Sequence, residues 1–288
     1  MNPADLFAPE YAGLSLIGVI VGLLATLLGI GGGLLMVPTL TLWGATPIQA
    51  VATSLAGIVL SSTSGTFQNW RMKQLNIERV ALLTPPAMLM SEVGVWISNH
   101  LPSTLLLISF ATLQVCAIFI TRLKRQLKRS GPPIFAVSGG VTGDCESSAL
   151  KNDNLSTAVT ATVTSKVLIF QIQAIGLLAG LLAGLFGVGG GIVMVPLQML
   201  FLGEPIKDAV RTSLGAVSLI SVWALAHHAL SGNVLWQAGL YLGMGGLLGA
   251  QLGARLLPKL PDAWVNTLFR GLLLMMASSM IIKALLGA

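Results

Sequence analysis

Two runs of three consecutive glycines contain the residues best suited to binding chemistry in this chain. The first copy has Gly31, Gly32, Gly33 and Pro38, and the second has Gly189, Gly190, Gly191 and Pro196. Glycine lets a ligand approach the backbone closely because no Cβ intervenes. A helix that begins after such a break presents unpaired N–H groups and the positive end of its dipole, which suit a small anion. The two triplets therefore predict an anion site, although small residues also serve close helix packing in membranes.

Hydroxyl side chains follow both triplets at matching distances. They are Thr53 and Ser54 in the first copy and Thr212 and Ser213 in the second. A hydroxyl there can donate to a bound oxyanion or bond to the backbone of its own helix, and the sequence leaves both readings open.

Several titratable or polar residues are candidates for proton coupling or for a hydrated pathway, because such groups in or near membrane spans usually mark pathways. They are Asn69, Glu92, Arg211, His227 and His228. Each also has a structural alternative, such as capping a helix end or anchoring at the membrane interface.

The segments that must position these residues occur twice. GLLATLLGIGGGLLMVP at residues 22 to 38 aligns with GLLAGLLAGLFGVGGGIVMVP at 176 to 196, and Asn69 then stands sixteen residues after Thr53 as His228 stands sixteen after Thr212. Internal self-similarity of this kind indicates homologous repeats. We predict a first repeat at 1–127, a polar linker at 128–166 and a second repeat at 167–288.

The composition excludes a water-soluble protein. Hydrophobic residues make up 54% of the chain and charged residues 9%, with a mean hydropathy of +0.85. Apolar stretches recur at 13–45, 47–67, 80–98, 102–121, 167–202, 205–230, 235–257 and 264–286. Most reach the ~20 residues that span a bilayer as a helix, and none alternates as a barrel strand would. The fold class is therefore all-α polytopic membrane protein with about eight hydrophobic segments.

The distribution of basic residues favours an inverted arrangement of the repeats. Four crossings per repeat would make the halves parallel and would place Lys207, Arg211, Arg255 and Lys259 outside. If the first segment of each repeat instead turns at its glycines and leaves on the side it entered, every loop lysine and arginine except Lys283 lies inside. Because basic residues favour cytoplasmic loops, the inverted topology fits better. A continuous helix over 13–45 would also be about 50 Å long, too long for one crossing.

Other classes of site have little support. Cys116 lies in an apolar stretch and Cys145 in the polar linker, so we expect neither a disulfide nor a metal site. The net charge of +6 arises from loops between spans, so we expect no nucleic-acid partner. We expect no cofactor, and no nucleotide-binding motif such as GxxxxGK[ST] occurs.

The two GGG…MVP motifs, each followed by TSL, together with His228 and GNVLW at 232–236, resemble the sulfite exporter TauE/SafE family of membrane permeases. The resemblance covers both repeats. It implies a secondary transporter of sulfite, thiosulfate, sulfoacetate or a related anion, usually in a bacterial inner membrane, and it carries over the glycines, prolines and hydroxyls above and His228 as site positions. The chain departs from the family pattern at Asn69, where histidine is frequent, and at Lys73, where glycine is frequent. A mechanism based on a symmetric pair of histidines is therefore disfavoured.

We therefore expect a non-enzymatic transporter in which a small sulfur-containing or organic anion binds between the two repeats and alternates between the membrane faces. Its partners would be this anion and membrane lipid, with a homodimer left open. The alternatives are a non-catalytic membrane subunit that docks a partner through residues 122–166 and, with less support, a membrane-embedded enzyme. Glu92 is the one carboxylate clearly within a predicted span and has no nucleophile motif near it.

Overall fold

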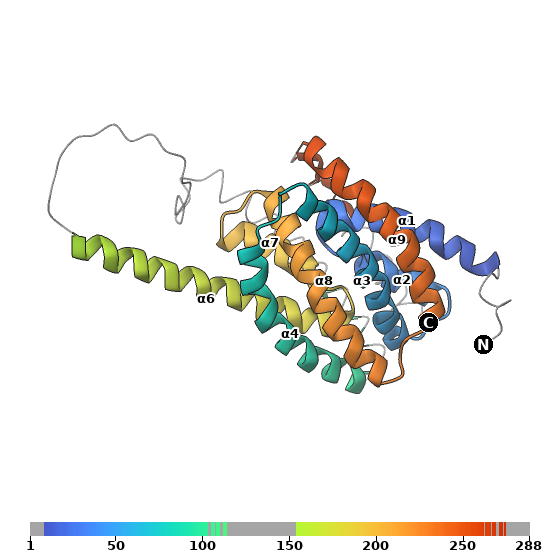
Figure 1. Ribbon diagram of the computed structural model, residues 1–288. Coiled ribbons are helices and arrows are strands. Elements are labelled where there is room, and N and C mark those ends of the chain that lie inside the picture. The colour runs from blue at the N-terminus through green and yellow to red at the C-terminus, as the bar shows by residue number, and fades with distance from the viewer. Residues whose placement is uncertain are drawn as a thin grey trace.

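The computed structural model describes residues 9–102 and 154–261, with isolated helical residues as far as Leu113 and Leu274. The described elements are helices (Figure 1), as the all-α prediction requires. They are α1 (Pro9–Leu28), α2 (Gly33–Leu42), α3 (Pro47–Arg71), α4 (Ile77–His100), α6 (Asn154–Phe186), α7 (Gly191–Phe201), α8 (Ile206–Leu230), α9 (Trp236–Leu256) and the short 3₁₀ helix η2 (Leu257–Lys259). Cys116, Cys145, Arg270 and Lys283 lie outside the described residues.

Four of the described helices are long and apolar enough to cross a membrane: α3, α4, the part Leu168–Phe186 of α6, and α8. The helices on either side of the first break, and α7 after the second, are shorter and apolar. The chain is therefore a multi-pass helical membrane protein. Helix α6 begins at Asn154, so the end of the predicted linker is already helical.

Each glycine triplet interrupts a helix, as the sequence predicts. Gly32 and Gly190 are the N-caps of α2 and α7 and have positive φ angles of 100° and 77°. An L-residue with a Cβ pays a steric penalty in this left-handed conformation, whereas glycine does not. The helices after the breaks begin at Gly33 and Gly191, the last glycine of each triplet.

Helices of the first half (α1 to α4) pack against helices of the second half (α6 to α9) along seams of glycine. A Cβ atom placed on Gly245 or Gly249 of α9 would overlap the carbonyl oxygens of Ser15 and Val19 in α1. Because the contacting residues advance together along both helices, α1 and α9 run parallel. The same close approach joins α6 to α4, where Gly180 and Gly184 meet Ala87 and Ser91.

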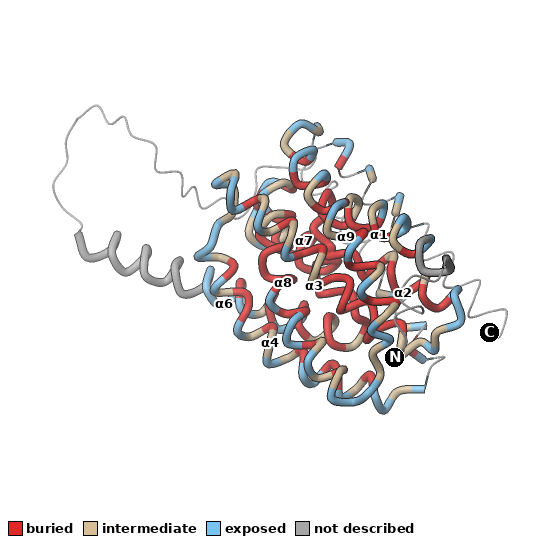
Figure 2. The backbone as a smooth tube through the Cα atoms, turned by 45° about the vertical axis from the view of Figure 1, so that its right-hand side comes forward, coloured by how far each residue is buried: buried red, intermediate tan, exposed pale blue. Residues whose placement is uncertain are grey.

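Helices α3 and α8 form the centre of the bundle, and buried residues concentrate around them (Figure 2). The Thr66 hydroxyl of α3 donates to the Leu214 carbonyl of α8, whereas Ile58, further toward the start of α3, lies near Val217, further toward the end of α8. The two helices therefore run antiparallel.

Basic loops of both halves meet at one end of this bundle. Arg79, in the first turn of α4, forms an ion pair with Glu204, which lies between α7 and α8. The Lys207 ammonium donates to the carbonyl of Pro258, 3.4 Å away, so the loops before α8 and after α9 lie at this end too.

Lys73 has the left-handed conformation that glycine adopts at the corresponding turn of the second half. Its φ is 55°, and Gly232 has a φ of 70°. A residue with a Cβ is strained there, so the departure from the family pattern noted above has a structural cost.

We expect Lys73→Gly to raise the stability of the folded protein by about 1 kcal/mol, because it removes this strain from an exposed turn. Thermal unfolding in detergent measures the change. Lys73→Ala keeps the Cβ and is the control. A gain equal in both variants would mean that the lysine charge, and not the backbone, is responsible.

Candidate functional site

The two glycine breaks cross in direct backbone contact at the centre of the protein. A Cβ atom on Gly33 would overlap the carbonyl oxygen of Gly187 and lie 2.6 Å from Val188 Cα. A Cβ atom on Gly191 would likewise overlap the carbonyl oxygen of Gly29. The structure thus brings the two predicted triplets together and leaves no space for an added methyl group between them.

Two predicted serines link each half to the break of the other. The Ser54 hydroxyl donates to the Gly187 carbonyl over 2.8 Å, and the Ser213 hydroxyl donates to the Gly29 carbonyl over 2.9 Å. Each hydroxyl also lies within hydrogen-bond distance of a carbonyl of its own helix. Both serines are fully buried. In this conformation their hydroxyl protons are therefore directed at backbone oxygens and not at a ligand.

Ile58 and Val217 fill the space beside the crossing breaks. Their side chains are fully buried, and both approach Gly31 and Gly189, with Val217 Cγ1 2.5 Å from the Cβ position of Gly31. Sequence reasoning missed this pair because aliphatic residues in apolar helices carry no distinguishing chemistry. The available signal was their equivalent position, five residues after Thr53 and five residues after Thr212 of the matched TSL motifs.

The N-termini of α2 and α7 lie at this crossing. The first hydrogen bonds of α2 run from Leu35 and Met36 to the Gly32 carbonyl, and those of α7 run to the Gly190 carbonyl. The N–H groups that precede these bonds thus lack a helical acceptor, as at any helix start. Pro38 and Pro196 lie buried inside α2 and α7, further from the breaks than the residues that cross there.

The predicted threonines are buried next to the serines. The Thr53 hydroxyl accepts a hydrogen bond of 2.9 Å from the backbone N–H of Leu235, directly before α9. Thr53 therefore connects the start of α3 to the other half. Thr212 occupies the matching place in α8 and is 2% exposed.

Asn69 and His228 are fully buried polar residues near opposite ends of the bundle. Neither amide atom of Asn69 has a hydrogen-bond partner among the described residues. His228 Nε2 lies 3.2 Å from the Gly184 carbonyl, which suits an Nε2–H donor, and Nδ1 has no partner in the described part of the chain. A buried polar atom without a partner is costly, so these positions can take a water molecule, a proton or a polar solute.

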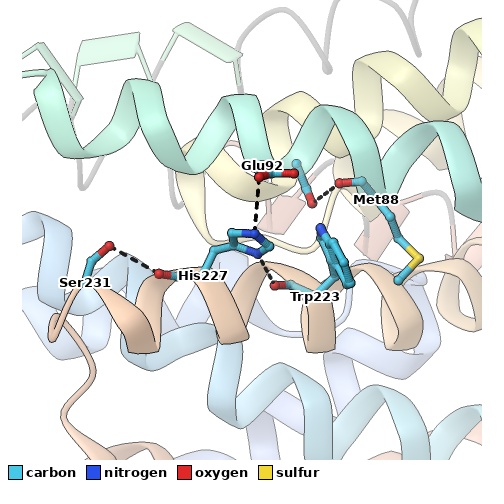
Figure 3. A network of polar contacts seen from close by, with 6 residues as sticks. Met88, Glu92, Trp223, His227 and Ser231 are labelled. Atoms are coloured by element: carbon cyan, nitrogen blue, oxygen red, sulfur yellow. Dashed lines mark hydrogen bonds and ion pairs between the residues drawn. The ribbon is translucent and has the colours of Figure 1, made fainter.

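Glu92 and His227 form a pair on the solvent- or lipid-accessible periphery of the bundle, between α4 and α8 (Figure 3). A Glu92 carboxylate oxygen lies 3.5 Å from His227 Nε2, while His227 Nδ1 lies 3.0 Å from the Trp223 carbonyl. The pair is thus separate from the crossing breaks. Arg211 is separate as well, because its guanidinium pairs with Asp208 of the same helix over 3.0 Å.

A pocket of about 440 Å³ opens between the loop that follows α2 and the start of α9. Its wall includes Trp43, Gln49, Trp236 and Gln237, whose side chains offer neutral hydrogen-bond donors, and Leu235, whose N–H reaches Thr53. Among the described residues, no group of three or more His, Cys, Asp or Glu side chains is arranged to hold a metal ion.

Relatives of the chain are consistent with membrane transport. It is 28% identical to the probable membrane transporter protein YunE of Bacillus subtilis, over 94% of this chain and 97% of the relative. It is 26% identical to a probable membrane transporter protein of Haemophilus influenzae, over 93% and 97%. A third, from Methanocaldococcus jannaschii, is 27% identical over 74% and 70%. No solved structure matches the chain.

The family model for the sulfite exporter TauE/SafE matches residues 14–280, which include both glycine breaks and the surrounding helices except the first turn of α1. The chain belongs to the sulfite exporter TauE/SafE family of membrane transporters.

Proposed function

We propose that this transporter moves a small sulfur-containing or organic anion, such as sulfite, thiosulfate or a sulfonate, across a bacterial inner membrane by alternating access. The observation that carries the proposal is the crossing of two glycine-capped helix N-termini at the centre of the bundle. Helix N-termini favour anions through their N–H groups and dipoles, and broken helices at the midplane are the binding elements of many secondary transporters.

We also propose that the two halves are inverted repeats. The antiparallel course of α3 and α8, which occupy matching places in the two halves, supports this. So does the meeting of Arg79 with Glu204, and of Lys207 with Pro258, at one end of the bundle. The positive-inside rule then makes this end cytoplasmic, and the pocket lined by Trp43 and Gln49 lies at the outer end.

The tight crossing of the breaks indicates how binding would proceed. An anion can reach the N–H groups only after the backbones near Gly33 and Gly191 separate, since no space exists between them here. Separation would release the Ser54 and Ser213 hydroxyls from the Gly187 and Gly29 carbonyls, so that they can donate to the anion instead. Anion binding would thus replace these bonds between the halves by bonds to the anion.

Coupling to an ion or proton gradient would require groups that titrate or accept solutes along the path. His228 and Asn69 are placed for this role, since both are buried at opposite ends of the bundle with polar atoms that have no hydrogen-bond partner among the described residues. Glu92 and Arg211 are less well placed, because Glu92 lies on the periphery of the bundle and Arg211 pairs with a carboxylate of its own helix.

Purified protein in liposomes tests the function directly. We expect a gradient-driven flux of at least one anion from a panel of sulfite, thiosulfate, sulfoacetate and small carboxylates, without any partner protein. Flux that a saturating second anion inhibits would identify a shared site. Absence of flux under every gradient would favour a non-transporting membrane subunit, and chemical conversion of a solute would favour an enzyme.

A further inference from the structure

The two ends of the bundle carry different side chains at positions that match between the two halves. Helices α4 and α9 begin at Ile77 and Trp236, and Arg79 therefore corresponds to Ala238. By the same alignment, in which Pro205 matches Pro47, Glu204 corresponds to Thr46. The basic end thus has an arginine and a glutamate where the other end has an alanine and a threonine.

At the outer end these small, uncharged residues accompany an open pocket. Ala238 lines the pocket of about 440 Å³, together with Ala45 and Gln49 on either side of Thr46. Val234, two residues before α9, also lines it. The loop before α3 and the start of α9, which belong to different halves, are therefore separated by accessible space at this end.

At the basic end the corresponding elements are held together. The Arg79 guanidinium on α4 contacts the Glu204 carboxylate in the loop before α8, and so bridges the two halves. The Glu204 side chain is 4% exposed, whereas that of Arg79 is 37% exposed. Leu75, the counterpart of Val234, packs against Gly215 of α8. The loop and the helix start that border a pocket at one end are thus joined by an ion pair at the other.

We infer that Arg79 and Glu204 form the gate at the cytoplasmic end and that the pocket beside Ala238 is the mouth through which the anion passes at the outer end. This inference rests on the proposed transport function. In alternating access the two ends cannot be open together, so the ion pair must break when the pocket closes. The exposed guanidinium makes this feasible, because water can solvate Arg79 once Glu204 leaves.

Anion chemistry gives the gate a reason to respond to substrate. A guanidinium binds carboxylates and oxyanions with similar geometry, so an anion that arrives at the cytoplasmic end competes with Glu204 for Arg79. An alanine at the outer end offers no such competition, and its neutral surroundings let an anion leave without being held. The difference between the ends thus suits capture on the inside and release on the outside.

Cysteine labelling in nanodiscs tests the gate. Leu75→Cys and Val234→Cys, each placed in a background where Cys116 and Cys145 are replaced by serine, report on the two ends through their rates with a water-soluble maleimide. We expect rapid labelling at 234 and slow labelling at 75. Glu204→Gln should speed labelling at 75 by about tenfold and slow it at 234, because it weakens the closed end.

Charge exchange and a matched control make the result specific. R79E alone should act as Glu204→Gln does, and the double variant R79E/E204R should return both rates toward the original values. Asp208→Asn removes a carboxylate that, in the described part of the chain, pairs with Arg211 of its own helix, and it should change neither rate. Unchanged labelling at 75 in Glu204→Gln, or a double variant no closer to the original than the single ones, would overturn the gate.

The outcome is separable from the fate of the proposed substrate, since labelling needs no anion. Reciprocal changes at 75 and 234 in a protein that carries none of the sulfur anions would support the gate and reject that substrate class. Sulfite or sulfonate flux that stays normal in R79E and in Glu204→Gln, with no change in labelling, would support the transport function and reject the gate.

Discussion

Gly33→Ala and Gly191→Ala are each expected to lower anion flux by about two orders of magnitude, the loss that a displacement of about 1 Å can cause at a binding site. The added methyl groups would overlap the Gly187 and Gly29 carbonyl oxygens, which belong to the opposite break. Backbone cannot move aside as a flexible side chain can. Flux into liposomes, divided by the amount of inserted protein, measures the effect.

The control is Gly13→Ala, because Gly13 lies in α1 and a Cβ there would meet nothing within 4 Å. It should insert and transport normally. The sequence does not distinguish the glycines within one triplet, whereas the structure gives neighbouring glycines different roles. Gly32 is needed for its positive φ, whereas Gly33 is needed for contact with the other half. Normal flux in both Gly33→Ala and Gly191→Ala would exclude the crossing breaks as the site.

Removal of both cross-half hydroxyls, in Ser54→Ala/Ser213→Ala, should have the second large effect. Each substitution takes away the donor to a buried carbonyl of the opposite break, at a cost of about 1–3 kcal/mol. We expect each single variant to lower the midpoint of thermal unfolding and the double variant to lower it further. Transport should fall in all three, because the same hydroxyls are proposed to bind the anion.

Ser62→Ala is the matched control. Ser62 is fully buried on α3 as Ser54 is, but among the described residues its hydroxyl donates to the Ile58 carbonyl of its own helix and to no residue of the other half. It should therefore unfold and transport nearly as the original protein does. Ser54→Thr keeps the hydroxyl and should retain part of the flux. Equal effects of Ser54→Ala and Ser62→Ala would show that the bonds between the halves have no special role.

The sequence was sufficient for the features that local chemistry determines. Three adjacent glycines interrupt a buried helix, so the breaks and the helices after them could be placed within a residue or two, although Pro38 and Pro196 lie inside those helices. Composition alone indicated lipid as the solvent. The alignment of the halves also identified the buried serines and threonines beside the breaks.

The partners of these residues could not be predicted, because they depend on how the halves cross. Nothing in the sequence pairs Ser54 with the carbonyl of Gly187, which is far away in the chain. Ile58 and Val217 look like any aliphatic residues of a membrane helix. Arg79 counted in the sequence only as a topology signal, and its contact with Glu204 depends on a loop of the other half.

The parallel seams between α1 and α9, and between α6 and α4, have a consequence for biogenesis. Helix α1 is synthesised before α9, yet it packs closely against Gly245 and Gly249 of α9, which lie far along the chain. Contacts between distant parts of a chain form late and slowly. After insertion the first half therefore stays incompletely packed until α9 has been synthesised and inserted. During that interval its unpacked face is accessible to the proteases and chaperones of membrane quality control.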